Sequence, residues 1–257
     1  MTPRWLPLLS VLGWLLAWEA LVRVAQIPHY TLPAPSLVLQ TLMDNFGSLS
    51  ASWWFTLKIT FGALALASIG GVLIAAMFVL SAPLEALLLP LAVVLQVTPI
   101  VAIAPLMLIY VESTTAALLL CAWIVAFFPI LSNTTLGLNS VDRNLRDLFK
   151  LNGATRWQEL WHLRLPAAMP YFLGGLKIAG GLALIGAVVA EFVAGSAGQS
   201  SGLASRIIES GYRLRTARLF AALILISLTG IVIFMTLTWI SHMMLRRWHE
   251  SALKQER

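Results

Sequence analysis

Few groups of residues in this 257-residue chain have the types and the spacing that catalysis requires. The four histidines stand far apart, at positions 29, 162, 242 and 249, and no H-E-x-x-H motif offers a zinc site. The single cysteine, Cys121, lacks a second thiol for a disulfide or a thiolate metal site. No G-x-x-x-x-G-K-[ST] phosphate loop is present, so we do not expect this chain to bind ATP in that way. The sequence predicts a protein that is not itself an enzyme.

The composition is typical of a membrane protein. Hydrophobic residues make up 59% of the chain, charged residues only 11%, and the mean hydropathy is +0.86. Soluble domains carry roughly 25% charged residues, so the chain is too apolar for that class. Four uncharged runs exceed the roughly 20 residues that cross a bilayer as a helix. They cover residues 59–84, 86–111, 113–141 and 219–245.

Two further runs contain charges that a membrane helix can accommodate. Glu19 and Arg23 lie four residues apart in the first run, where they can pair on one helical face. We expect this run to be a span; a cleaved signal peptide is the alternative, but no small-x-small cleavage site follows it. The sequence therefore predicts an all-α integral membrane fold with one transmembrane domain over residues 1–257. The six expected spans are about 5–25, 53–80, 84–110, 114–138, 170–193 and 219–245.

Basic residues predict the orientation of the spans. If the N-terminus is cytoplasmic, ten lysines and arginines fall on that side, mainly in the loop 139–165 and in the C-terminal tail. Cytoplasmic loops are enriched in these residues, so we expect both termini and this loop in the cytoplasm. Four arginines between positions 206 and 218 fall on the other side, and the sequence gives them no role.

Polar residues and prolines inside the spans are candidates for a solute pathway. Pro99 and Pro105 each remove a backbone donor, so the third span should kink or break within residues 96–105. Non-helical backbone at membrane depth is tolerated where it is buried in protein or lines a water-filled cavity. A helix with a simple proline kink is an equal alternative. Glu191 follows thirteen uncharged residues and either faces a water-filled path, has a partner or lies at the interface. The pathway candidates are Gln96, Thr98, Pro99, Asn133 and Glu191.

The densest polar segment covers residues 140–166. Gly153 ends a first amphipathic stretch, and Thr155 with Gln158 has the spacing of a capping box that starts a second one. Pro166 is expected to end that second helix. The predicted apolar stripe consists of Trp157, Leu160 and Trp161, opposite Arg156 and Glu159. Such a stripe could lie among lipid headgroups or fit a groove on another protein.

The same segment resembles a family signature: E-A-A, three residues, G, nine residues, I-x-L-P. Here Asp147 takes the acidic position, Gly153 the glycine, and Leu163–Pro166 the last four. Leu148 and Phe149 replace the two alanines. This signature is found in permease subunits of binding-protein-dependent ABC importers. Further segments are similar to the branch that serves sulfonates, taurine, nitrate and the pyrimidine precursor of thiamine: 32–42, 96–110, 126–138, 165–181 and 191–193.

The resemblance implies a type I ABC importer permease with six transmembrane helices and a cytoplasmic coupling helix. It also implies a cytoplasmic ATPase dimer, an external binding protein and a second permease copy, with a homodimer expected, in the inner (plasma) membrane of a bacterial cell. ATP and Mg²⁺ would be used by the ATPase, and this chain would bind no cofactor and no nucleic acid. The residues expected to couple to the ATPase are Asp147, Gly153, Ala154, Arg156, Trp157, Glu159, Leu160, Trp161, Leu163 and Pro166. Among them we expect Trp157, Leu160 and Trp161 to be the anchors of the interface and Arg156 with Glu159 to form its rim.

Two other functions remain open from the residues. An ion-gradient-driven secondary transporter would need several intramembrane carboxylates, whereas Glu191 is the only good candidate, with Glu85 and Glu112 near span ends. An intramembrane enzyme is the weaker alternative. Sulfonate, nitrate and a thiamine-precursor pyrimidine all remain possible solutes, and overall similarity slightly favours the pyrimidine.

Overall fold

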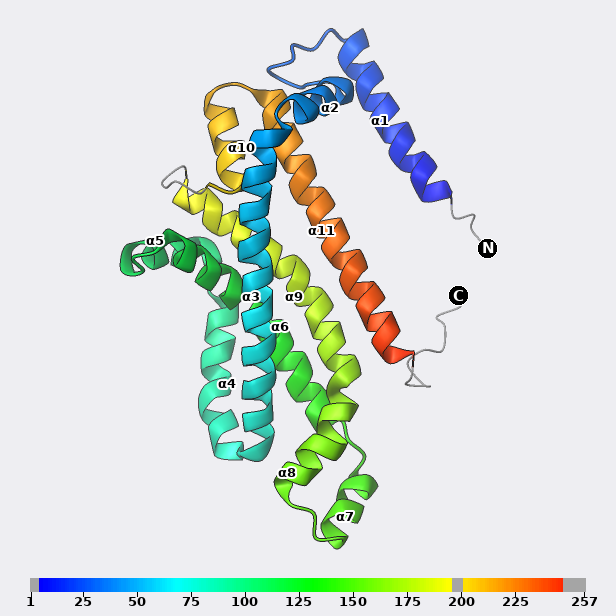
Figure 1. Ribbon diagram of the computed structural model, residues 1–257, viewed down its shortest axis with the longest axis vertical. Coiled ribbons are helices and arrows are strands. Elements are labelled where there is room, and N and C mark those ends of the chain that lie inside the picture. Colours follow the sequence, from blue (N-terminus) through cyan, green and yellow to red (C-terminus); the bar gives the residue numbers. More distant parts are fainter. Residues whose placement is uncertain (1–4, 196–200, 247–257) are drawn as a thin grey trace. The chain divides into compact units, whose positions relative to one another are not determined.

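The computed structural model describes residues 5–195 and 201–246. Every regular element in these two ranges is a helix, which confirms the predicted all-α fold. In chain order (Figure 1) the elements are α1 (Leu6–Val24), α2 (Pro35–Asp44), α3 (Phe46–Leu80), α4 (Ala82–Val97), α5 (Ile100–Tyr110), α6 (Thr114–Asn139), α7 (Arg143–Leu151), α8 (Arg156–Glu159), η1 (Leu160–Arg164), α9 (Leu165–Ala194), α10 (Leu203–Tyr212) and α11 (Thr216–Leu245).

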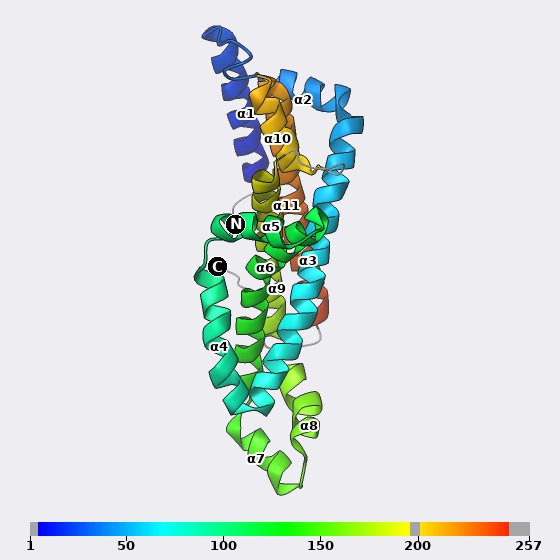
Figure 2. The same ribbon diagram turned by 90° about the vertical axis from the view of Figure 1, so that its left-hand side faces the viewer.

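The chain forms two compact units. The first consists of Met1–Thr56 with Ala194–Leu228, and the second of Leu57–Val193 with Thr229–Arg257. Within the second unit, α3, α4, α6 and α9 run alongside one another in both views (Figures 1 and 2). At one end of these helices, where α3 gives way to α4, lie the short helices α7 and α8 (Figures 1 and 2).

Four helical stretches among the described residues are long and apolar enough to cross a membrane, and the bent pair α4–α5 raises the number to five if it forms one span. The four are Phe46–Leu80, Thr114–Asn139, Arg156–Ala194 and Thr216–Leu245. Helix α1 occupies the position of the first expected span. The total of six spans therefore stays a prediction.

The expected break in the third span lies at Thr98 and Pro99. Both residues are extended, and the axes of α4 and α5 differ by 102°. Pro99 has no N–H to donate and disfavours a helical conformation at the residue before it, which explains why α4 ends here. Pro105 lies inside α5 and does not interrupt it. The sequence therefore identified the break correctly, at the first of the two prolines.

Small residues bring α6 and α9 close together in the second unit. A Cβ added to Gly186 would lie 2.9 Å from the Cα of Ala122, and one added to Gly175 would lie 2.8 Å from the Pro129 carbonyl oxygen. Glycine and alanine allow the two backbones to approach this closely. In lipid the hydrophobic effect does not pull helices together, so van der Waals packing at such close contacts stabilises their association. Cys121 is buried in the same part of α6.

In the first unit, charged residues connect helices as well as neighbouring turns. The predicted pair forms, with Arg23 Nη2 2.6 Å from Glu19 Oε1, and Glu19 also accepts hydrogen bonds from the backbone N–H and hydroxyl of Ser36. Glu19 therefore links α1 to the start of α2. The apolar core beneath is formed by Val38, Leu49, Leu203, Ala221, Ala222 and Leu225.

Helix α10 contains part of the arginine segment to which the sequence gave no role. Arg206 donates to the Ser52 hydroxyl at 2.9 Å and pairs with Glu209 at 2.9 Å, while Arg213 pairs with the same carboxylate at 3.3 Å. The hydrogen bond from Arg206 is the main cause that lowers the pKa of Glu209, and partial burial of the carboxyl opposes it. These arginines therefore hold α10 within its own unit.

Candidate functional site

The polar segment folds into the helix–turn–helix that the sequence predicts. Asp142 caps α7 by accepting a hydrogen bond from the Asn144 N–H at 2.7 Å. After α7, Gly153 adopts a φ of +72°, the left-handed conformation that residues with a Cβ rarely adopt. Apart from its two chain neighbours, no described residue has a heavy atom within 4 Å of a Cβ built at this position, so backbone conformation rather than space accounts for the glycine.

The second helix starts at the predicted capping box. The Thr155 hydroxyl accepts from the Gln158 N–H at 3.3 Å, and the Gln158 side chain accepts from the Thr155 N–H at 2.8 Å. Two backbone donors that would otherwise lack partners are thereby satisfied. The capping box fixes the direction in which α8 leaves the turn.

The prediction that Pro166 ends this helix is wrong. The helical stretch continues from Arg156 through η1 and α9 to Ala194. The turn before the proline is a π-helix, in which the Leu165 N–H donates to the Leu160 carbonyl. This wider turn changes the hydrogen-bond register just before a residue that has no N–H to donate, so the proline is accommodated. A short polar helix and a spanning helix thus form one continuous element.

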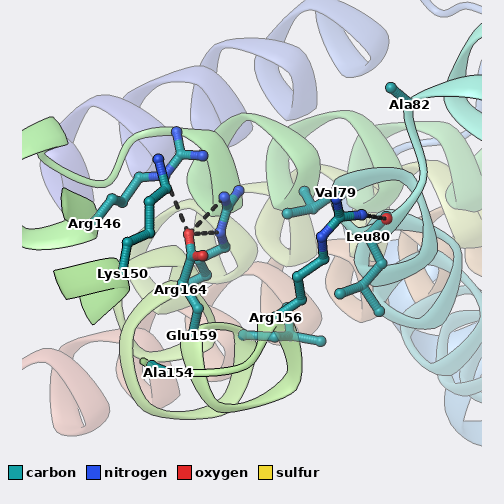
Figure 3. Close-up of a pocket in the computed structure, with 10 residues that line it drawn as sticks. Val79, Leu80, Ala82, Arg146, Lys150, Ala154, Arg156, Glu159 and Arg164 are labelled. Carbon is teal, nitrogen blue, oxygen red and sulfur yellow. Dashed lines mark hydrogen bonds and ion pairs between the residues drawn. The ribbon is translucent and has the colours of Figure 1, made fainter. Parts of the chain in front are cut away.

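A buried ion-pair network holds α7 against this element (Figure 3). Glu159 Oε1 lies 2.7 Å from Arg164 Nη2 and 3.1 Å from Arg146 Nε. The side chains of Glu159 and Arg164 are only 11% and 9% exposed. Arg164 Nη1 also reaches the Leu138 carbonyl and the Asn139 side chain at 3.5 Å, which connects the network to the end of α6. The network ties three helices together.

Two residues of this network, Arg146 and Arg164, were not among the predicted site residues. Ion pairs on an α-helix join residues three or four apart, whereas Glu159 and Arg164 are five apart. The π-helical turn lies between them, and a π turn is a rare feature that composition does not reveal. The only feature of the sequence that could have indicated this network was Arg164, an arginine flanked by leucines at the start of an apolar run.

The structure separates the predicted stripe into exposed and buried residues. Trp157 and Trp161 are 61% and 63% exposed, as a surface for a partner requires. Leu160, predicted on the same surface, is buried at 2% exposure, and Glu159, predicted at its rim, is buried at 8%. The prediction that these two face outwards is wrong, because Glu159 turns towards the arginines of its own chain and Leu160 packs inwards.

The other predicted coupling residues lie around the two tryptophans and the turn. Asp147 is exposed and pairs with Lys150 at 3.2 Å, and Arg156 Nη1 donates to the Leu80 carbonyl at 3.3 Å. Leu163 and Pro166 are half-buried, as is Ala154, which lines a cavity beside Arg156. Helix α7 also exposes apolar side chains, namely Leu145, Leu148 and Leu151.

Three of the pathway candidates lie together. Gln96, Thr98 and Pro99 line a cavity of about 350 Å³ at the α4–α5 break, to which α6 and α9 also contribute lining residues. Its other walls are apolar: Leu95, Val97, Ile100, Ile124, Val125, Pro129 and Leu182. Thr98 also donates its hydroxyl to the Val94 carbonyl at 2.7 Å. Each of these lining residues is uncharged, and Gln96 carries the largest polar group among them.

The other two pathway candidates lie elsewhere in the second unit. The Asn133 amide donates to the Pro129 carbonyl of its own helix at 2.8 Å, and its Cβ would lie 2.9 Å from a Cβ added to Gly175 of α9. Glu191 is buried at 1% exposure near the end of α9. This burial does not fit the alternative of a carboxylate exposed at the interface. Neither residue is part of the cavity wall around Gln96.

Residues 67–247, including the polar segment, the α4–α5 break and the α6–α9 contact, match the family described as "Binding-protein-dependent transport system inner membrane component". The chain belongs to this family. It is a permease subunit of a binding-protein-dependent ABC importer, a multi-pass protein of the inner membrane and a transport subunit.

Similar proteins agree with this assignment. The formylaminopyrimidine transport permease protein ThiX of Halalkalibacterium halodurans is 32% identical over 93% of this chain and 94% of its own length. The riboflavin transport system permease protein RibX of Chloroflexus aurantiacus is 31% identical over 92% of this chain and 87% of its own. A solved structure, "Crystal structure of an amino acid ABC transporter with histidines", matches with a TM-score of 0.63 at 18% identity, covering 80% of this chain and 96% of that one. This last similarity shows the type I permease fold.

Proposed function

We propose that the segment from α7 to η1 (Arg143–Arg164), called the α7–η1 segment below, couples this permease to a cytoplasmic ATPase dimer. This dimer would bind ATP and Mg²⁺ and hydrolyse the ATP. The observation that carries the proposal is a pair of exposed tryptophans, Trp157 and Trp161, on a capped helix that continues into the spanning helix α9. Large aromatic side chains are the usual anchors of protein interfaces. Because α8, η1 and α9 are continuous, a displacement of the anchored end reaches the membrane without an intervening flexible joint.

The Glu159 network serves this function from inside the segment. It fixes α7 to η1 and to the end of α6, so that α7 and α8 move together. Glu159 and Leu160 are thus positioning residues, whereas the two tryptophans with Asp147 form the contact surface. Gly153 and the capping box set the angle between the two short helices.

We further propose two permease copies, as a homodimer, with both termini and the α7–η1 segment in the cytoplasm and an external binding protein on the opposite side. The excess of lysines and arginines on the side of the α7–η1 segment supports this orientation. In this arrangement this chain binds no cofactor itself.

The proposed solute is a small polar heteroaromatic compound such as a thiamine-precursor pyrimidine. The cavity at the α4–α5 break has uncharged walls, with one primary amide and one hydroxyl among apolar side chains. A flat, neutral ring fits such walls, whereas a sulfonate or nitrate anion would favour a cationic side chain. The formylaminopyrimidine and riboflavin permeases, which resemble this chain, carry the names of heteroaromatic solutes.

Two measurements on the reconstituted complex test these proposals. Uptake into proteoliposomes should persist when proton and sodium gradients are collapsed and ATP is kept, and uptake that stops would refute ATP-driven import. Binding protein loaded with formylaminopyrimidine should stimulate ATP hydrolysis more than binding protein loaded with taurine or nitrate. Equal or greater stimulation by the anions would refute the solute class and leave the coupling proposal untouched.

A further inference from the structure

A second polar cavity, of about 390 Å³, lies beside the α7–η1 segment in the unit Leu57–Val193. Figure 3 shows its walls: α7 and η1 on one side, and the turn between α3 and α4 on the other. Its volume lies within the roughly 300–1,000 Å³ of small-molecule sites. The lining residues are Val79, Leu80, Ala82, Arg146, Lys150, Ala154, Arg156, Glu159, Leu160 and Arg164.

The charges around this cavity do not balance. Among the lining residues that the structure describes, four side chains are cationic and one is a carboxylate, Glu159, whose Oε1 atom already accepts from both Arg146 and Arg164. Arg156 donates to a neutral carbonyl, that of Leu80, at 3.3 Å. Among residues 5–195 and 201–246, Lys150 pairs only with Asp147, which lies outside the cavity wall, and both side chains of that pair are more than 60% exposed. The cavity therefore has an excess of positive charge.

The position of the cavity places this charge at the end of apolar helices. Val79 and Leu80 are the last residues of the spanning helix α3, and α4 begins at Ala82. Helix α4 then exposes Leu87 at 66%, Leu91 at 58% and Val94 at 58%, at i, i+4 and i+7 spacing on one face. A cationic pocket at the start of a helix that exposes apolar side chains matches the two parts of an anionic phospholipid.

We propose that this cavity binds a phosphate group, supplied either by the headgroup of an anionic phospholipid whose chains lie along α4 or by free phosphate. The planar guanidinium group of Arg156 can donate paired hydrogen bonds to phosphate oxygens, and Lys150 contributes a point charge. The bound anion complements the positive charge that Glu159 leaves unbalanced. This site is separate from the exposed tryptophans and from the cavity at Gln96.

The test counts bound ligands on the purified permease–ATPase complex by native mass spectrometry. After delipidation, the complex is offered dioleoyl phosphatidylglycerol, dioleoyl phosphatidylcholine or inorganic phosphate in separate titrations. The variant is Lys150→Gln with Arg156→Gln, which removes two cavity cations and keeps the Glu159 network. The matched control is Arg143→Gln with Arg215→Gln, which removes the same charge from exposed positions outside the cavity.

Wild type and control should bind phosphatidylglycerol alike, and the cavity variant should bind it roughly tenfold or more weakly. Phosphate adducts that the cavity variant loses, without preference for phosphatidylglycerol, would assign the site to free phosphate. Equal binding of phosphatidylcholine and phosphatidylglycerol, or equal losses in variant and control, would overturn the proposal. If the variant does not fold, phosphatidylglycerol must still leave the wild type as salt rises, and retention at high salt would overturn the proposal equally.

Discussion

Replacing Glu159 with glutamine is expected to loosen the α7–η1 segment while the spanning helices keep their packing. The substitution preserves the shape of the side chain but removes the charge that Arg146 and Arg164 share. Arg164 would then remain buried, at 9% side-chain exposure, beside a neutral amide. Its other contacts, at 3.5 Å from the Leu138 carbonyl and the Asn139 side chain, are long and replace little of the loss.

The size of the effect follows from burial. Breaking a buried ion pair by removing one partner costs roughly 3–5 kcal/mol. Glutamine still offers one acceptor oxygen, so we expect a local cost of about 2–3 kcal/mol. This cost corresponds to a roughly 30- to 150-fold increase in the equilibrium constant for local opening of the α7–η1 segment. The matched control is Asp147→Asn, which breaks the exposed pair with Lys150 in the same segment. Exposed pairs contribute about 0–1 kcal/mol, so this change should raise opening by at most about fivefold.

Amide hydrogen exchange on the detergent-purified permease measures these openings segment by segment. Peptides that cover 143–165 should exchange faster in Glu159→Gln, and peptides from α6 should keep the wild-type rate. Equal exchange in the two variants would show that the network does not hold the segment. Faster exchange spread over α6 and α9 would show instead that Glu159 stabilises the whole fold.

Three further outcomes are expected. Gly186→Ala should lower the melting temperature, because the added Cβ overpacks against Ala122 at a cost of about 1–3 kcal/mol. Gly181→Ala in the same helix, where a Cβ meets nothing within 4 Å, should leave the melting temperature unchanged. Equal melting temperatures of the two variants would contradict the proposed helix contact. Because its pKa is lowered, ionised Glu209 stabilises α10 at pH values above the ordinary glutamate pKa of about 4.5, and this contribution is lost as the pH falls through the lowered pKa. Glu209→Gln should remove this acid dependence from amide exchange in α10, and an unchanged pH profile would refute it. Glu191→Gln should impair uptake with normal ATPase retention if the buried carboxylate belongs to the pathway, and wild-type uptake would exclude that role.

The local signals in the sequence predicted the backbone well. Pro99 marks the α4–α5 break, Gly153 takes the left-handed conformation, and the Thr155–Gln158 capping box forms as its spacing indicates. Each of these features depends on residues close together in the chain, so steric limits and short hydrogen bonds decide them. The pair Glu19–Arg23 was predictable for the same reason.

The errors arose where side-chain contacts between helices or a rare helical turn decide the outcome. Helical periodicity placed Leu160 beside the tryptophans and Glu159 at a polar rim, but the arginines at 146 and 164 pull that carboxylate inwards. Pro166 was expected to stop a helix that a π turn carries past it. A pattern of apolar residues cannot distinguish a side chain that faces a partner from one that faces the same protein.

The proposed function requires that a partner ATPase binds at the exposed tryptophans of the α7–η1 segment. The most direct test is retention of the ATPase during purification of Trp157→Ala with Trp161→Ala. The control is Trp54→Ala with Trp239→Ala, since these tryptophans are each 62% exposed on the spanning helices α3 and α11, close to the 61% and 63% of the pair. We expect the first variant to insert normally but to retain roughly a tenth or less of the ATPase, while the control retains all of it. Equal retention by both variants would show that the ATPase does not bind at these tryptophans.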